Sequence, residues 1–153
     1  MKCLKTIPVF ILLSCFYLQS SAQQTTVAIN EPDYNKPKLF ADLPDKMPLD
    51  VSSIENFFSL RTGSSTRVLP SINTLFVGNI VSASDVQNAK TTIISLTNRP
   101  GATFTFTKIT NSDGTIAYRG RIISRNNSDA FEVVKEKDQY FLIKKNLYDL
   151  MNE

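Results

Sequence analysis

Apolar and polar residues alternate most regularly between Ala102 and Ser124, on both sides of a short polar stretch. Phe104 and Phe106 alternate with threonines, and this period of two places their rings on one face of a β-strand. The residues after the polar stretch alternate in the same way, with isoleucine, tyrosine and glycine on one face and arginine on the other. The segment therefore predicts a β-hairpin with one apolar face.

The apolar faces of the two strands must match, and this requirement selects the turn. A two-residue loop would set Phe104 and Phe106 against arginines. A three-residue loop at 112–114 instead pairs Phe104 with Ile122 and Phe106 with Gly120, and it places a glycine at the left-handed position that closes such hairpins. We predict this register. An aromatic ring over Gly120 would also cover its bare backbone, and a bend or bulge at this glycine is an equal alternative.

One helix and six strands are predicted along the chain. Ile54, Phe57 and Phe58 stand at helical spacing within residues 49–60. Either Asp50 caps this helix, or Ser52 caps it and Glu55 completes a capping box. The strands are predicted at 74–82, 90–97, 103–110, 115–124, 130–136 and 139–145. Short loops join most of them, so neighbouring strands must be antiparallel. We therefore predict an α+β fold in which one N-terminal helix packs on a curved antiparallel β-meander of about six strands, with a small, partly open β-barrel as the alternative.

The last predicted hairpin, from Ala130 to Lys145, has apolar residues on both faces, so its register stays open. Leu147, Leu150 and Met151 then stand at helical spacing. We expect a short C-terminal helix or turn that docks on the sheet and covers its second face.

The first 22 residues have the pattern of a secretory signal peptide, with two lysines, an apolar run from Ile7 to Leu18, and small residues up to Ala22. The apolar run is shorter than the roughly 20 residues that a membrane span needs. We expect cleavage near Ala22 and a periplasmic or secreted protein. Lipidation of Cys15 is an alternative, because Leu12 to Cys15 loosely resembles a lipobox, but the apolar residues after Cys15 argue against it.

The rest of the chain divides into a lead-in at 23–48 and a single α+β domain at 49–153. The lead-in is rich in proline, asparagine and aspartate, which predicts an extended or disordered segment. It is either an arm for a partner or a plain tether.

Composition removes several kinds of chemistry. The chain has no histidine, and its two cysteines, Cys3 and Cys15, both lie in the leader. We therefore expect no enzyme, no catalytic residues, no metal site and no cofactor. Without Lys2 and Lys5, the 17 basic residues become 15, against 14 acidic ones, and this near-neutral balance gives no reason to expect nucleic acid as a partner.

Two surface features remain as candidates. Lys108, Arg119 and Arg121 are predicted to converge on the polar face of the central hairpin as a patch for an anion or a partner, although charged outward faces are ordinary. Glu132 is the one acid flanked by strongly apolar residues within a strand. We interpret it as a solvent-facing residue rather than as half of a catalytic pair.

The segment from Thr103 to Glu153 combines a hairpin, the strand sequence Gly-Arg-Ile-Ile at 120–123 and a closing sequence at 144–153. In these features the chain resembles small secreted β-rich proteins of unknown function from Gram-negative bacteria. The resemblance implies a periplasmic or secreted protein and no particular activity.

We therefore expect a non-enzymatic binding module whose partner is a protein or another envelope macromolecule, bound through the sheet face, the hairpin turns or the N-terminal arm. A proteinase-inhibitor-like domain is one alternative, by fold analogy alone. A carrier of a small apolar ligand or a carboxylate-dependent hydrolase is the other. A filled core favours the first two functions, whereas a cleft that holds buried acids favours the last.

Overall fold

The computed structural model describes residues 35–71 and 74–151, so the predicted signal peptide and Cys15 lie outside the described residues. Eight antiparallel strands in the described part form one sheet, in the order β1-β8-β7-β6-β5-β4-β3-β2. They are β1 (Lys46–Leu49), β2 (Ser65–Ser71), β3 (Thr74–Val86), β4 (Ala89–Leu96), β5 (Ala102–Thr110), β6 (Ile116–Ser124), β7 (Asp129–Glu136) and β8 (Gln139–Asn146). The helical segments are α2 (Val51–Glu55), η2 (Asn56–Ser59) and α3 (Leu147–Met151).

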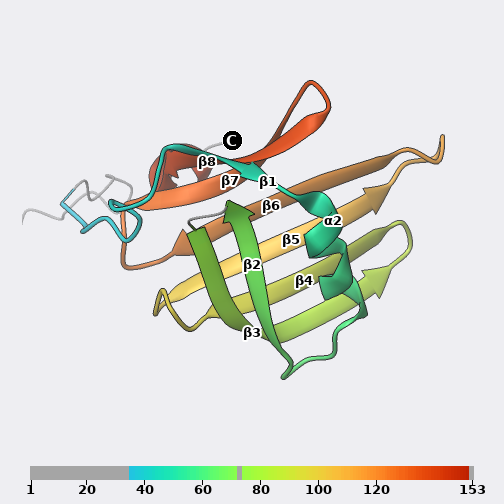
Figure 1. Ribbon diagram of the computed structural model, residues 1–153, viewed down its shortest axis with the longest axis horizontal. Helices are drawn as coiled ribbons and strands as arrows, with labels where there is room; N and C mark the ends of the chain where they lie inside the picture. Colours follow the sequence, from blue (N-terminus) through green and yellow to red (C-terminus); the bar gives the residue numbers. More distant parts are fainter. Residues whose placement is uncertain (1–34, 72–73, 152–153) are drawn as a thin grey trace, which may run out of the picture. The chain divides into compact units, whose positions relative to one another are not determined.

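The sheet curls into a half-barrel, so that β1 and β2, at opposite ends of the strand order, approach each other (Figure 1). The predicted α+β class, with one helix on about six strands, is therefore wrong, and the fold is mostly β. The sequence pattern does not indicate β1 because this strand has four residues and contains Pro48. Proline is tolerated there because β1 is an edge strand that pairs only with β8 in the described sheet.

The helix predicted over 49–60 is much shorter in the structure. Asp50 caps α2, and its Oδ1 accepts a hydrogen bond from the Ser52 N–H at 3.0 Å. After Glu55 the chain tightens into the 3-10 helix η2. The segment consists largely of serine, valine and phenylalanine, which are weaker helix formers than alanine or leucine. Burial of Ile54 and Phe57 therefore holds this short piece in place more than intrinsic preference does.

The register predicted for the central hairpin is confirmed. Phe104 pairs with Ile122 and Phe106 with Gly120, and the strands pair without a break from end to end. The Asn111 N–H donates to the Thr115 carbonyl at 2.8 Å, which leaves the three-residue loop 112–114, and the glycine of this loop has a φ of 82°. The matching of apolar faces was thus enough to choose the turn.

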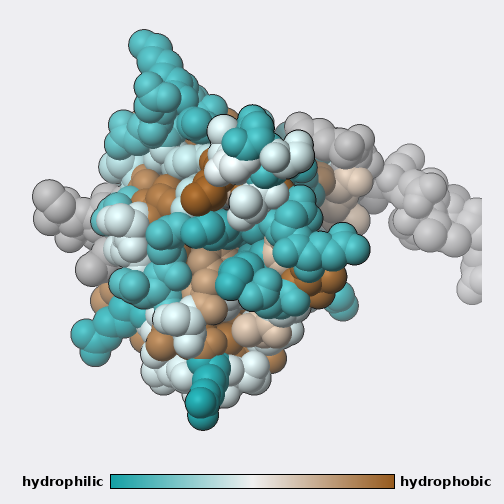
Figure 2. All heavy atoms as spheres, turned by 90° about the vertical axis from the view of Figure 1, so that its right-hand side faces the viewer, coloured by the Kyte–Doolittle hydropathy of each residue, from teal (hydrophilic) through white to brown (hydrophobic). Residues whose placement is uncertain are grey.

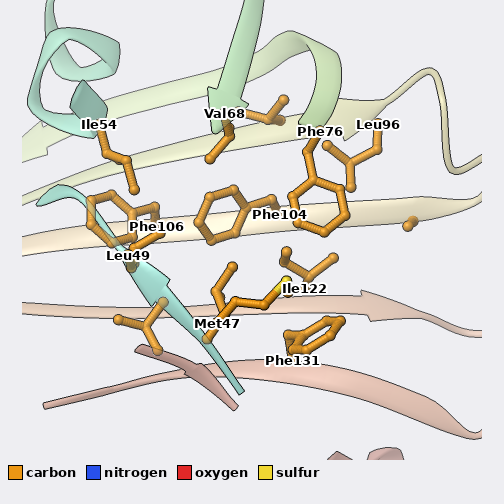
Figure 3. Packing of buried hydrophobic residues seen from close by; sticks show 14 of the residues in the cluster. Met47, Leu49, Ile54, Val68, Phe76, Leu96, Phe104, Phe106, Ile122 and Phe131 are labelled. Atoms are coloured by element: carbon orange, nitrogen blue, oxygen red, sulfur yellow. The ribbon is translucent and has the colours of Figure 1, made fainter. Parts of the chain in front are cut away.

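The core lies on the inner side of the curl, where aromatic rings from distant parts of the chain meet (Figure 3). Phe104 and Phe106 are fully buried at its centre, and α2 and η2 add Ile54 and Phe57 to the same core. The residues buried most deeply include Phe40, Phe76, Phe104, Phe106 and Phe131. Large apolar side chains of the described residues are therefore packed into this interior.

Residues 35–48, within the segment predicted as a lead-in, lie against the sheet and contribute to the core. Phe40 is fully buried, and its ring packs edge-on against Phe131 with 5.2 Å between centroids. The buried carboxylate of Asp129 accepts hydrogen bonds from the backbone N–H groups of Leu39 and Phe40, at 2.7 and 2.8 Å. One side chain of β7 thereby fixes the course of this segment.

The β7–β8 hairpin, whose register the sequence leaves open, pairs Val133 with Leu142 and turns through residues 137–138. Both faces of this hairpin are covered at its base. The inner face joins the main core, and on the outer face Leu147 and Leu150 of α3 pack with Ala130. This second layer explains the apolar residues on both faces.

Candidate binding groove between β6 and β7

The sheet has one weak seam, between β6 and β7. These strands pair only at Arg121–Glu132 and Ile122–Phe131, whereas β5 and β6 pair over nine residues and β7 and β8 over eight. The sheet therefore consists of a five-stranded group, β2 to β6, and a three-stranded group, β7, β8 and β1, joined by two residue pairs. Toward their turns the β5–β6 and β7–β8 hairpins diverge (Figure 1).

The divergence leaves free edges in the middle of the sheet, namely residues 116–119 of β6 and 134–136 of β7, which have no strand partner across the seam in the described sheet. The opening between them is a groove of about 580 Å³, lined by both strands and by Tyr140 of β8. An unpaired strand edge presents backbone N–H and C=O groups to an incoming chain. We call this opening the β6–β7 groove.

Gly120 lies where the two hairpins separate. A Cβ atom at this position would lie 2.7 Å from the Thr105 carbonyl oxygen, 2.9 Å from the Phe106 ring and 3.1 Å from a methyl group of Val133. The absence of a side chain lets Val133 of β7 pack closely against β6 at the base of the groove. It also lets the Phe106 ring lie close to the glycine backbone, which is one of the two alternatives predicted for this position.

Tyr140 occupies the inner side of the groove. Its hydroxyl oxygen accepts a hydrogen bond from the Tyr118 N–H at 3.2 Å, and its ring meets the Tyr118 ring edge-on with 5.4 Å between centroids. If the register of β6 and β7 continued, Tyr118 would pair with Lys135. A phenol therefore takes the position that a strand carbonyl would occupy in an unbroken sheet.

The other wall of the groove is held by a polar network on the inner face. The carboxylate of Glu55 in α2 accepts hydrogen bonds from the Tyr118 hydroxyl and from Lys108 Nζ, the latter at 2.6 Å. The Lys108 and Tyr118 hydrogen bonds hold the pKa of Glu55 below its usual value. Burial, reinforced by Glu55, raises the pKa of the Tyr118 phenol, which therefore stays a hydrogen-bond donor at neutral pH.

Tyr118 is thus fixed on three sides. Its ring stacks on Phe106 with 5.6 Å between centroids and an interplanar angle of 7°. Glu55 binds its hydroxyl, and Tyr140 meets both its ring and its N–H. The β6 side of the groove is therefore a rigid wall.

The structure separates the three predicted patch residues. Arg119 and Arg121 lie together on the outer face of β6, but Lys108 shares the inner face with Phe106 and is paired with Glu55. Arg121 also donates to the Leu150 carbonyl at 3.0 Å and lies 3.7 Å from Glu132. Arg119 is exposed and has no ion pair among the described residues.

The carboxylates of Glu132 and Asp129 both have structural partners. Glu132, which the sequence singles out, lies beside Arg121, and its side chain is 20% exposed. Asp129, the buried acid, holds the backbone of residues 39 and 40. Among the described residues, no three acidic, cysteine or histidine side chains are grouped closely enough to hold a metal ion.

The groove lies toward the end of the sheet that carries the turns of the β3–β4, β5–β6 and β7–β8 hairpins. At this end, apolar surface shows between hydrophilic side chains (Figure 2). In the described parts of the chain, no helix has the length and apolar character that crossing a membrane requires.

Comparison with known proteins gives no further guide. No protein-family model, no curated protein and no solved structure matches this chain. The resemblance to small secreted β-rich proteins therefore stays a prediction, and the function has to be inferred from the groove itself.

Sequence reasoning missed the groove, although two signals were present. Gly120 stands within a strand pattern, where glycine commonly marks a bulge or a close backbone approach. Tyr140 stands near the start of the second strand of the last hairpin, but its hydroxyl contacts a residue 22 positions away. Only the fold reveals that contact.

Proposed function

We propose that the protein is a non-enzymatic binding module, periplasmic or secreted, that takes up an extended segment of another protein as an added strand in the β6–β7 groove. The observation that carries the proposal is the Tyr118 N–H, a strand donor that a side-chain hydroxyl satisfies in place of a neighbouring strand. Strand addition uses such main-chain groups for affinity and the alternating side chains for specificity.

The dimensions of the groove support a short segment. The free edge at 116–119 is four residues long, which corresponds to about 13 Å of extended chain. Backbone groups alternate in direction along an antiparallel strand, so Ile116 and Tyr118 turn their N–H and C=O groups toward the groove. A partner segment of four to six residues would therefore engage the whole free edge of β6.

Burial of several phenylalanine rings inside the curl supports binding at this surface over carriage of a small apolar ligand. The acids support it too. Glu55 and Glu132 are paired with cations, and Asp129 binds two backbone N–H groups. A carboxylate-dependent hydrolase needs an acid whose pKa is raised in a cleft, whereas the pKa of Glu55 is lowered.

Selection of peptides tests the proposal. The purified protein is used to select binders from a library of random extended peptides, and each binder is titrated into ¹⁵N-labelled protein. Strand addition predicts the largest amide shifts, and new protection from hydrogen exchange, at residues 116–119 and 134–136. Amides of β4, which pairs on both edges, serve as the internal control. Binders that shift only the hairpin loops, or that leave the groove amides unchanged, would refute the proposal.

A further inference from the structure

We infer that the protein has a second binding site, a pocket beside α3 on the outer face of the sheet, which takes a small amphipathic anion, namely an aliphatic carboxylate. The pocket has a volume of about 400 Å³. Sites for small molecules usually measure roughly 300–1,000 Å³, so a short aliphatic chain is of the right size. The inference is independent of the proposed function, because none of the free-edge residues of the β6–β7 groove lines this pocket.

The apolar part of the pocket belongs to the second, smaller core of the fold. Leu147 and Leu150 of α3 are buried with Ala130, and the half-buried Ile123 of β6 packs against them. A helix of five residues is only about 8 Å long, so α3 covers only part of the outer face. The space beside it is the α3 pocket, whose mainly apolar lining includes Ile123, Leu147, Leu150 and the exposed Met151.

Cations border this apolar lining, and no acidic side chain is among the described residues that line the pocket. Arg125, which directly follows β6, is exposed. Lys36 Nζ donates to the Arg125 carbonyl at 3.1 Å and lies 5.9 Å from the centre of the Tyr148 ring. An ammonium group has three donors, so this contact leaves donors for a ligand. Neither Arg125 nor Lys36 has an ion pair in the described part of the chain.

Arg121 also lines the pocket, but its side chain is already engaged. It donates to the Leu150 carbonyl at 3.0 Å and lies 3.7 Å from Glu132. Its role is therefore to hold the end of α3 against β6. The charge of an anion would be met by Lys36 and Arg125, the two cations of the lining that have no acidic partner among the described residues.

These features together fit a molecule with one apolar end and one negative end. Each methylene group that leaves water tightens binding by up to about four-fold. A carboxylate accepts charge-assisted hydrogen bonds from both lysine and arginine. A cation with the same chain would gain the apolar contacts but would bring a positive charge toward Lys36 and Arg125. An inorganic anion would gain only the charge contacts, so the pocket should require both parts of the ligand.

Titration of ¹⁵N-labelled protein with octanoate, decanoate and dodecanoate tests the inference. Each carboxylate should shift the amides of residues 123–125 and 147–151, and the groove amides at 116–119 and 134–136 are the internal control. Decanoate is expected to bind about ten-fold more tightly than octanoate, because it buries two more methylene groups. Decyltrimethylammonium, which has the same chain and a positive head, is expected to bind at least about five-fold more weakly than decanoate.

Arg125→Gln should weaken decanoate binding by about two- to five-fold and reduce its advantage over decyltrimethylammonium. The folded protein should be retained, because the Arg125 side chain is exposed and has no ion pair among the described residues. Arg67→Gln is the matched control. Arg67 is an exposed strand arginine on β2 and does not line the α3 pocket, so its replacement should leave decanoate binding unchanged.

Four results would overturn the inference. Equal affinity for decanoate and decyltrimethylammonium would mean that the pocket selects apolar chains without regard to charge. Equal shifts of the same amides by inorganic phosphate would mean attraction by charge alone. Binding to phosphatidylglycerol vesicles without amide shifts by soluble decanoate would indicate docking on a membrane surface. The fourth is the absence of shifts at 123–125 and 147–151 with every carboxylate. The proposed function would stand in each case, because it is measured with peptides and at the groove amides.

Discussion

Replacing Tyr140 with phenylalanine should lower the stability of the protein and raise its affinity for an extended peptide. The hydroxyl of Tyr140 accepts a single hydrogen bond, from the Tyr118 N–H at 3.2 Å. The side chain is buried, and its ring packs edge-on against the Tyr118 ring. Tyr140→Phe removes the acceptor and leaves the ring in place, so packing is conserved and the change isolates one hydrogen bond.

The expected magnitude follows from that hydrogen bond. An intramolecular hydrogen bond contributes about 0.5–1.5 kcal/mol net, and 3.2 Å is at the long end of the range for N–H···O. The free energy of unfolding, measured in urea, should therefore fall by about 0.5–1 kcal/mol. An incoming strand no longer has to displace the hydroxyl, so peptide affinity should rise by the same amount, or about two- to five-fold.

Tyr118→Phe is the matched control. It removes a hydroxyl from the neighbouring ring, but that hydroxyl donates to Glu55 and does not contact the free edge. Stability should fall, because a hydrogen bond to a charged group is lost, whereas peptide affinity should stay unchanged. If Tyr140→Phe lowers both the stability and the peptide affinity, the Tyr140 hydroxyl contributes to the peptide-binding surface. That result would refute the view that the hydroxyl occupies the place of an added strand.

Three further predictions concern stability. The Asp129 carboxylate is buried and accepts two backbone N–H bonds, and Asp129→Asn keeps its shape but removes its charge. The free energy of unfolding in urea should fall by about 2–3 kcal/mol. A fall below about 0.5 kcal/mol would contradict the view that Asp129 fixes the backbone of residues 39 and 40. Gly120→Ala should lower the free energy of unfolding by about 1–3 kcal/mol, because its Cβ would stand 2.7 Å from the Thr105 carbonyl oxygen. An unchanged melting temperature would show that β5 and β6 can move apart to accept the methyl group. The pKa of Glu55 is lowered on folding, so its contribution is present above the unfolded pKa of about 4.5 and is lost as the pH falls through the folded pKa. Glu55→Gln should therefore be less stable than the wild type at pH 7, with a difference that shrinks on acidification; a difference independent of pH would refute the charge-based explanation.

The central hairpin was predictable because its information is local. Two alternating faces, one turn glycine and a chain reversal within about twenty residues leave a single register that buries both phenylalanines. The edge strand β1 was not predictable, because its four residues become a strand only through pairing with β8, which lies almost a hundred residues later in the chain. Met47 and Leu49 are buried there, but they occur in a proline-rich stretch whose pattern indicates no strand.

The position of Lys108 was contained in the predicted register, although the predicted patch did not use it. Phe104, Phe106 and Lys108 alternate along one face of β5, whereas Arg119 pairs with Thr107 on the opposite face. The network with Glu55 could not be foreseen in the same way, because it depends on where α2 crosses the sheet. Alternation assigns a residue to a face, but contacts between distant elements require the fold.

The β6–β7 groove raises a question that every unpaired strand edge raises, namely what prevents a second copy of the protein from pairing with it. Charged side chains and interruption of the free edge are the usual means, and both occur here. Arg119 and Lys135 flank the opening, and Tyr140 occupies one of its backbone donors. An edge of β6 from a second copy would bring a second Arg119 into the same opening, near the first Arg119 and Lys135. Any segment that binds in the groove must therefore accommodate these charges and displace the Tyr140 hydroxyl, so the features that protect the edge also limit which segments can enter it.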